Sequence, residues 1–126
     1  MTNLSQIYAD IICDKTFRKT ASLLVTKSGV RSDLRGFACL TDAIILYGTE
    51  SCESFCEIYR VIGELRHIKT KTVMREMSYC IMRSYDLPER LTELTGTNIK
   101  LSEVHCGMVI SCLGEMFKHP DPSLYD

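Results

Sequence analysis

The sequence predicts an all-α protein, a compact bundle of about six or seven helices that contains a helix-turn-helix. Apolar residues recur three or four positions apart through most of the chain, and no stretch has the two-residue period of a strand. Glycine, proline and short polar runs divide the chain into segments of helix length. At 126 residues, 45% of them apolar and 25% charged, the chain is long enough for one domain with its own core.

Three helices are expected in the first part of the chain. An amphipathic helix covers residues 3–14, and a second covers residues 17–27 and stops at Gly29, which supplies a left-handed residue. Ser32 is the expected N-cap of a third helix that Gly48 ends.

The central part of the chain predicts two helices joined by a short polar segment. The leading helix begins near Ser51 or Ser54, and a basic segment follows at residues 66–72. Thr70 or Thr72 is the expected N-cap of the second helix, because a threonine hydroxyl can accept a bond from a free backbone N–H. Two helices with a tight connection are the layout of a helix-turn-helix.

The second helix of this pair, expected over about residues 70–85, has two distinct faces. At 100° per residue one face points toward the core and carries Val73, Met77, Cys80, Ile81 and Ser84. The opposite face carries Lys71, Arg75, Ser78, Tyr79 and Met82, with Thr72 at its edge. We therefore expect Lys71, Arg75 and Tyr79 to project into solvent.

The last part of the chain predicts two more helices and a tail. A short helix over residues 88–95 opens with a proline in its first turn and closes at Gly96. Ser102 is the expected N-cap of the final helix, which runs to Phe117. The tail, residues 119–126, contains two prolines and is expected to fray.

Charge is unevenly distributed although the net charge is only −1. Residues 60–90 hold seven Lys/Arg against four Asp/Glu, whereas residues 91–126 hold two against five. The basic block coincides with the predicted helix-turn-helix, where a surface for nucleic-acid phosphates would lie. A second interpretation is that these cations only keep an exposed helix solvated.

The pattern predicts a role for each candidate DNA-binding residue. Arg75 and Lys71 would be the main readers of base edges, because arginine and lysine pair with guanine. Thr72, Ser78 and Tyr79 would assist them, and Lys69 and Arg66 would contact phosphates.

The seven cysteines predict reduced thiols in an intracellular protein. The count is odd, residues 1–3 show no start of a secretory signal, and most of the cysteines lie at apolar helical positions that predict burial: Cys13, Cys39, Cys80, Cys106 and Cys112. Cys52 and Cys56 are four residues apart and Cys106 follows His105, but neither set completes a zinc site.

No cofactor, metal or enzymatic activity is expected from the remaining motifs. None of the three histidines has a carboxylate or cysteine at a catalytic spacing, and no glycine-rich phosphate loop occurs. No run reaches the about 18 apolar residues that a membrane span needs. We therefore expect a cytoplasmic protein that does not enter a membrane.

Several motifs resemble the C-terminal DNA-binding effector domain of the stage-zero sporulation response regulator family. Its opening segment resembles Gly29-Val30, Arg35-Gly36-Phe37, Leu40 and Ala43-Ile44. Residues 58–63 resemble its leading helix, although Arg60 replaces a proline. Residues 73–85 align without gaps on its recognition helix, and the closing loop and last helix match Leu94-Thr95-Gly96 and Ser102-Glu103-Val104.

The resemblance spans about residues 21–117. It implies a DNA-binding transcription regulator, often bound as paired copies, with an N-terminal helical extension at residues 1–20, an effector-like domain at 21–118 and a flexible tail. Because only about twenty residues precede the match, no phosphoacceptor domain is expected in this chain. Of the arginines on the family's recognition helix only Arg75 is retained, with Lys71 partly restoring the charge.

The sequence supports a second hypothesis, that of an effector-like domain that binds proteins rather than DNA. Met74, Met82 and Tyr79 would then form a soft apolar patch beside scattered charge, and such a patch suits a protein partner. For the DNA-binding hypothesis a homodimer is expected, because readers of tandem sites gain affinity by linkage between copies.

Overall fold

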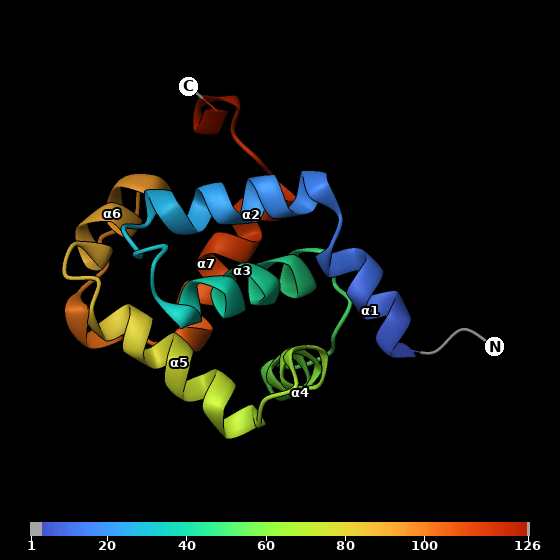
Figure 1. Ribbon diagram of the computed structural model, residues 1–126. Coiled ribbons are helices and arrows are strands. Elements are labelled where there is room, and N and C mark those ends of the chain that lie inside the picture. Colours follow the sequence, from blue (N-terminus) through green and yellow to red (C-terminus); the bar gives the residue numbers. More distant parts are fainter. Residues whose placement is uncertain (1–3, 126) are drawn as a thin grey trace.

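The protein is a bundle of seven α-helices and two short 3-10 helices in residues 4–125, the part of the chain that the computed structural model describes (Figure 1). The predicted all-α fold class is confirmed, and these residues contain no strand. The elements are α1 Leu4–Ile12, α2 Lys15–Lys27, α3 Arg35–Gly48, α4 Phe55–Arg66, α5 Thr70–Met82, α6 Leu87–Thr95, η1 Leu101–Glu103, α7 Cys106–Lys118 and η2 Pro122–Tyr125.

Helix α3 is the centre of the bundle. All eight residues from 39 to 46 are buried, so the helix has no solvent face over two turns. A helix that is buried on every side needs neighbours all around it. Helices α1, α2, α4, α5 and α7 provide them, and α5 lies at the edge of the molecule (Figure 1).

The N-terminal end of α3 packs directly on the backbone of α5. A Cβ at Gly36 would overlap the carbonyl oxygen of Glu76 and would lie 2.7 Å from the Cys80 sulfur, so the crossing requires a glycine. Burial raises the pKa of Cys80, and hydrogen bonds from the backbone of Gly36 and Phe37 partly offset that rise. The α5 thiol thus helps to satisfy the first N–H groups of α3.

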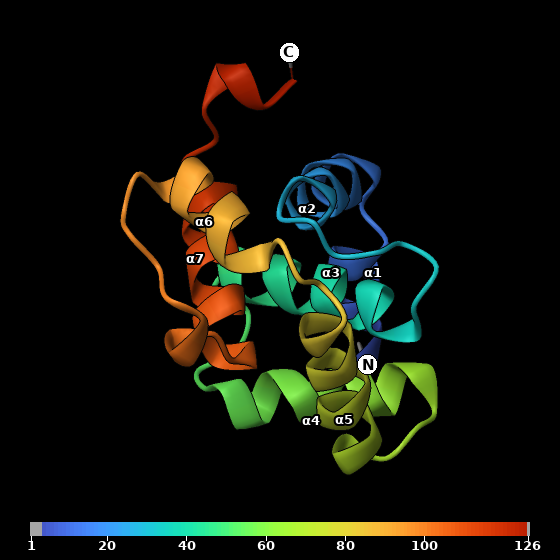
Figure 2. The ribbon, with the colours of Figure 1, turned by 90° about the vertical axis from the view of Figure 1, so that its left-hand side faces the viewer.

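A short corner, residues 67–69, joins α4 to α5, which cross at a steep angle (Figure 2). His67 adopts a left-handed conformation with φ 58°, and the Ile68 N–H bonds the Gly63 carbonyl at 3.0 Å. The carbonyl of Lys69 then accepts the Thr72 N–H at 2.9 Å, so α5 already begins at Thr70. Lys69 occupies the N-cap position without a side-chain bond, and the prediction of a threonine cap is wrong.

Other predicted helix starts differ in their agreement with the structure. Ser54 caps α4 as expected, accepting the Glu57 N–H at 3.1 Å. Ser32 does not cap α3, whose N-cap position is Leu34, because the helix starts only where it meets α5. Ser102 lies in η1, and the Nδ1 of His105 caps α7 by accepting the Met108 N–H at 3.2 Å.

Helix ends also show both agreement and difference. Gly29 and Gly96 have the expected left-handed backbone, with φ of 91° and 74°. Helix α3 ends at Gly48 as predicted, but the residue with positive φ in the connection that follows is Glu50. Helix α5 ends at Met82 rather than near residue 85.

The two ends of the described chain are more regular than predicted. Asp14 caps α2 by accepting the Phe17 N–H at 3.0 Å, and α2 starts at Lys15, so the predicted domain boundary after residue 20 falls inside this helix. The tail contains the 3-10 helix η2. Residues 1–3 and 126, which include the first position of the predicted N-terminal helix and the last of the tail, lie outside the described residues.

Candidate nucleic-acid interface

Helix α5 is anchored to the bundle by its inner face, as predicted. Val73, Met77 and Cys80 are fully buried, and Ile81 is nearly so. Ser84, just beyond the helix, is buried and donates its hydroxyl to the Cys80 carbonyl at 2.7 Å. These contacts with α3 and α4 fix the rotation of α5 about its own axis.

We define the outer face of α5 as the exposed side chains Lys71, Met74, Arg75, Ser78, Tyr79 and Met82. Tyr79 is 49% exposed and Met82 is 74% exposed. The face carries two cations and no carboxylate. The predicted orientation of Lys71, Arg75 and Tyr79 toward solvent is therefore confirmed.

The cations of the corner and of the outer face have no internal partner. Among residues 4–125, no carboxylate forms an ion pair with Lys69, Lys71 or Arg75. Arg60 on the neighbouring helix differs, because it pairs with Glu64 at 2.9 Å. Three such charges between residues 69 and 75 give this edge of the molecule a positive field that can act on a ligand.

Arg66, the other predicted phosphate contact, does have an internal partner. Its Nε donates to Oδ2 of Asp42 at 2.6 Å, and the carboxylate is buried in α3. This hydrogen bond raises the pKa of Arg66 despite partial burial of the guanidinium.

The three remaining predicted residues differ in accessibility. Thr72 is half-buried at the edge of the outer face, as its angle on the helix predicts. Ser78 is exposed, but its Oγ lies 3.3 Å from the Cys106 sulfur at the start of α7. Tyr79 is exposed. Ser78 therefore links α5 to α7 as well as facing solvent.

Arg35, which sequence reasoning missed, lies beside the same edge. It begins α3 and lines a groove of about 330 Å³ with Arg66, Thr72 and Glu76. It is exposed and has no ion pair among residues 4–125. The Arg35-Gly36-Phe37 motif was the one sequence feature that pointed to this residue. Because Arg75 on α5 follows Arg35 by forty residues, the sequence alone does not show that Arg35 lies beside α5.

The cysteines are only partly buried. Cys39 and Cys80 are buried, and burial raises the pKa of Cys39 to about 11. Cys106 and Cys112 are half-buried, whereas Cys13 is exposed because it follows the end of α1, so its predicted burial is wrong. Within residues 4–125, no three His, Cys, Asp or Glu side chains group closely enough to hold a metal ion.

The fold and the outer face of α5 together characterise the protein. Within residues 4–125 it is an all-helical bundle in which one peripheral helix turns to solvent a face whose cations form no ion pair. None of the described helices has the length and apolar character needed to cross a bilayer. No protein-family model matches the chain, and no match was found among curated proteins or solved structures.

Proposed function

We propose that this protein binds double-stranded DNA and regulates transcription in the cytoplasm, with α4 and α5 acting as a helix-turn-helix. The observation that carries the proposal is the division of α5 into two faces. Its inner face is buried in the core, while Lys71 and Arg75 project from its first two turns and form no ion pair with a carboxylate of residues 4–125. The major groove of B-form DNA is wide enough to admit such a helix.

Arg75 is the proposed reader of sequence. Its guanidinium can donate two parallel hydrogen bonds to one guanine, and such a pair contributes about 1–3 kcal/mol of discrimination against other bases. Lys71 lies one turn earlier on the same face, and Tyr79 lies one turn later. Recognition helices of this kind contact bases mainly from their N-terminal turns.

Phosphate contacts would come from the sides of α5. Lys69 lies in the corner, and Arg35 lies across the groove that borders Thr72. Each lysine or arginine that neutralises a phosphate releases a counterion and makes binding more sensitive to salt. These residues would hold the helix in register without reading the base sequence.

The resemblance to the sporulation effector domain supports the same proposal. It assigns the recognition helix to residues 73–85, which overlap α5, and it retains Arg75. The paired copies that it implies predict a homodimer on adjacent half-sites, where linkage between two copies raises the affinity.

Selection of bound duplexes from a random pool tests this function. Wild-type protein should enrich a common motif, and Arg75→Ala should bind more weakly and lose the preference at one base-pair position of that motif. Arg60→Ala is the matched control, because Arg60 is an exposed arginine already paired with Glu64 on α4. A pool that gains no motif after several rounds, together with salt-insensitive binding, would contradict the proposal.

The exposed apolar residues favour a second candidate, a protein-binding module. Met74, Tyr79 and Met82 on the outer face of α5 are 46%, 49% and 74% exposed. If this candidate is correct, Met82→Ser should weaken a complex whose stability changes little with salt, whereas DNA binding should fall steeply as salt rises.

A further inference from the structure

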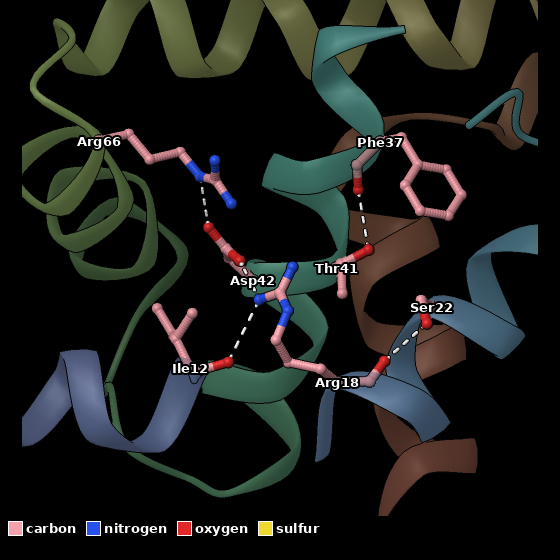
Figure 3. A network of polar contacts seen from close by, with 7 residues as sticks. All are labelled: Ile12, Arg18, Ser22, Phe37, Thr41, Asp42 and Arg66. Carbon is pink, nitrogen blue, oxygen red and sulfur yellow. Dashed lines mark hydrogen bonds and ion pairs between the residues drawn. The ribbon is translucent and has the colours of Figure 1, made fainter. Parts of the chain in front are cut away.

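One carboxylate inside the bundle holds two arginines from different helices. Asp42 lies on α3 and is 1% exposed. Its Oδ1 accepts a hydrogen bond from Nη1 of Arg18 on α2 at 2.9 Å, and its Oδ2 accepts one from Nε of Arg66 on α4 at 2.6 Å (Figure 3). Both carboxylate oxygens are thus matched by a cation, which a buried charge requires.

The two arginines are similar in exposure but different in what they attach. Their side chains are 36% and 35% exposed. Arg18 also donates to the Ile12 carbonyl at 3.2 Å, so it connects Asp42 to the end of α1 (Figure 3). Arg66 is the last residue of α4 and directly precedes the corner. Of the two arginines bonded to Asp42, Arg66 is therefore the one that connects the carboxylate to the corner.

The position of the first turn of α5 depends on the Asp42–Arg66 hydrogen bond more than the position of the rest of the helix does. Its inward anchors begin only at Val73, whereas Thr70 and Lys71 are exposed. The corner itself has little freedom, since a Cβ at Gly63 would lie 2.8 Å from the Ile68 carbonyl oxygen. Holding the end of α4 in place therefore also constrains the position of Lys71, which follows Arg66 after four residues.

We infer that Asp42 and Arg66 are a positioning pair that sets the start of α5 against DNA, and that Arg66 does not contact phosphate. This inference rests on the proposed DNA binding. The guanidinium supports the interface from behind by holding the corner, because its Nε already donates to the buried carboxylate of Asp42.

Salt-dependent duplex affinity of Arg66→Met, Asp42→Asn and the double variant tests the inference. Each single variant should bind about tenfold more weakly, a loss equal to about 1.4 kcal/mol. The slope of log affinity against log salt should stay at the wild-type value. The double variant should bind like either single variant, because both changes remove the same Asp42–Arg66 hydrogen bond and loss of the Arg18 half of the network should not alter duplex affinity. A slope reduced by about 0.9 in Arg66→Met would mark a phosphate contact and overturn the inference, as would unchanged affinity.

Arg18→Met is the matched control, since it removes the other half of the same network. It should lower the melting temperature but leave duplex affinity at the wild-type value when the protein is folded. Equal losses of affinity in Arg18→Met and Arg66→Met would show a general effect on stability and overturn the positioning role. If Asp42→Asn does not fold, Arg66→Met and Arg18→Met still decide the question.

Amide hydrogen exchange without DNA separates failure of the inference from failure of the proposed function. The N–H groups of Thr72 and Val73 bond the Lys69 carbonyl, and their exchange should accelerate in Arg66→Met but not in Arg18→Met. Unchanged exchange in both variants overturns the inference. A wild-type chain without affinity for duplex DNA overturns the proposed function, and the exchange result still shows whether Arg66 anchors α5.

Discussion

Two surfaces of this molecule carry lysines, and they differ in whether a carboxylate lies close enough to form an ion pair. At the end of α7, the Nζ of Lys118 lies 3.1 Å from Glu50 and 3.5 Å from Glu115, and 4.9 Å from the centre of the Tyr47 ring. At the corner and on the outer face of α5, Lys69, Lys71 and Arg75 have no carboxylate partner among residues 4–125.

The difference distinguishes a structural cation from one available to a ligand. Glu50 reaches Lys118 from a left-handed backbone with φ 55°, a conformation uncommon for a residue with a side chain. The fold thus places the Glu50 carboxylate beside Lys118 even though Glu50 takes an unfavourable backbone conformation. It places no carboxylate of residues 4–125 within ion-pair distance of Lys71 or Arg75 on α5. Unpaired positive charge on a rigid helix suits an anionic partner.

The largest expected effect comes from removing the two unpaired lysines. Lys69→Ala with Lys71→Ala removes the proposed phosphate contact of Lys69 and the proposed base contact of Lys71. It should therefore weaken duplex binding more than about tenfold at about 0.1 M salt and reduce the salt slope by about 0.9 for the lost phosphate contact. Fluorescence anisotropy over a salt series measures both quantities. Lys118→Ala is the control with a paired lysine, and it should leave the slope unchanged; equal slopes in all three proteins would remove the distinction between the surfaces.

The next effect concerns the support beneath the outer face of α5. Gly36→Ala should destabilise the fold by about 1–3 kcal/mol, because the new methyl group meets the backbone of α5, which cannot rotate away. Gly107→Ala is the control: its nearest contacts are 3.4–3.5 Å away in the first turn of α7, and it should change the stability much less than Gly36→Ala does. Urea unfolding measures both. A neutral Gly36→Ala would mean that α3 and α5 can separate without cost.

A smaller effect on the free energy of unfolding is expected when acid protonates Glu57 at the start of α4. The Glu53 backbone N–H and the Tyr8 hydroxyl donate to Glu57 and hold the pKa of its carboxyl below the ordinary value of 4.5. A lowered pKa contributes stability that is complete above the unfolded value and is lost as pH falls through the folded value.

Unfolding free energies of wild type and Glu57→Gln, measured by urea titration from about pH 6 downward, check this contribution. The difference between the two proteins should shrink once the pH is below 4.5. A difference that stays constant with pH would assign the effect to packing. Duplex binding by the α5 face should not depend on this substitution, since Glu57 lies in the first turn of α4 and the corner follows the last turn.

The smallest effect should come from Lys118 itself. Lys118→Met should lower the melting temperature only slightly, because exposed ion pairs gain little in water. Circular dichroism during heating measures the shift. A large loss would mean that the Tyr47 ring and Glu50 hold the end of α7 more firmly than their exposure indicates.

The two faces of α5 could be predicted because helical periodicity alone fixes them. Val73 and Met77 are buried and Lys71 and Arg75 are exposed, as the spacing requires. The caps could not be predicted in the same way, because a serine caps a helix only where tertiary packing lets the helix begin. His105 caps α7 instead of Ser102 for that reason.

Contacts between distant residues were beyond the sequence pattern. Asp42 is 24 residues from each of its arginines, and nothing in the local spacing pairs them. Arg66 looked like a free cation in a basic segment, and only the fold reveals its buried partner. Arg35 likewise joins the candidate interface through the crossing of α3 on α5, and DNA contact by any of these residues stays a prediction.

The Arg18 link has a practical bearing on how the protein is divided for study. A fragment starting at residue 21, where the family resemblance starts, would cut α2 in half and delete Arg18 together with the Ile12 carbonyl that it holds. Asp42 would then keep one counterion in place of two. Expression trials and crystallisation should therefore retain α1 and all of α2, because a cut at residue 21 would weaken the part of the core on which α5 packs.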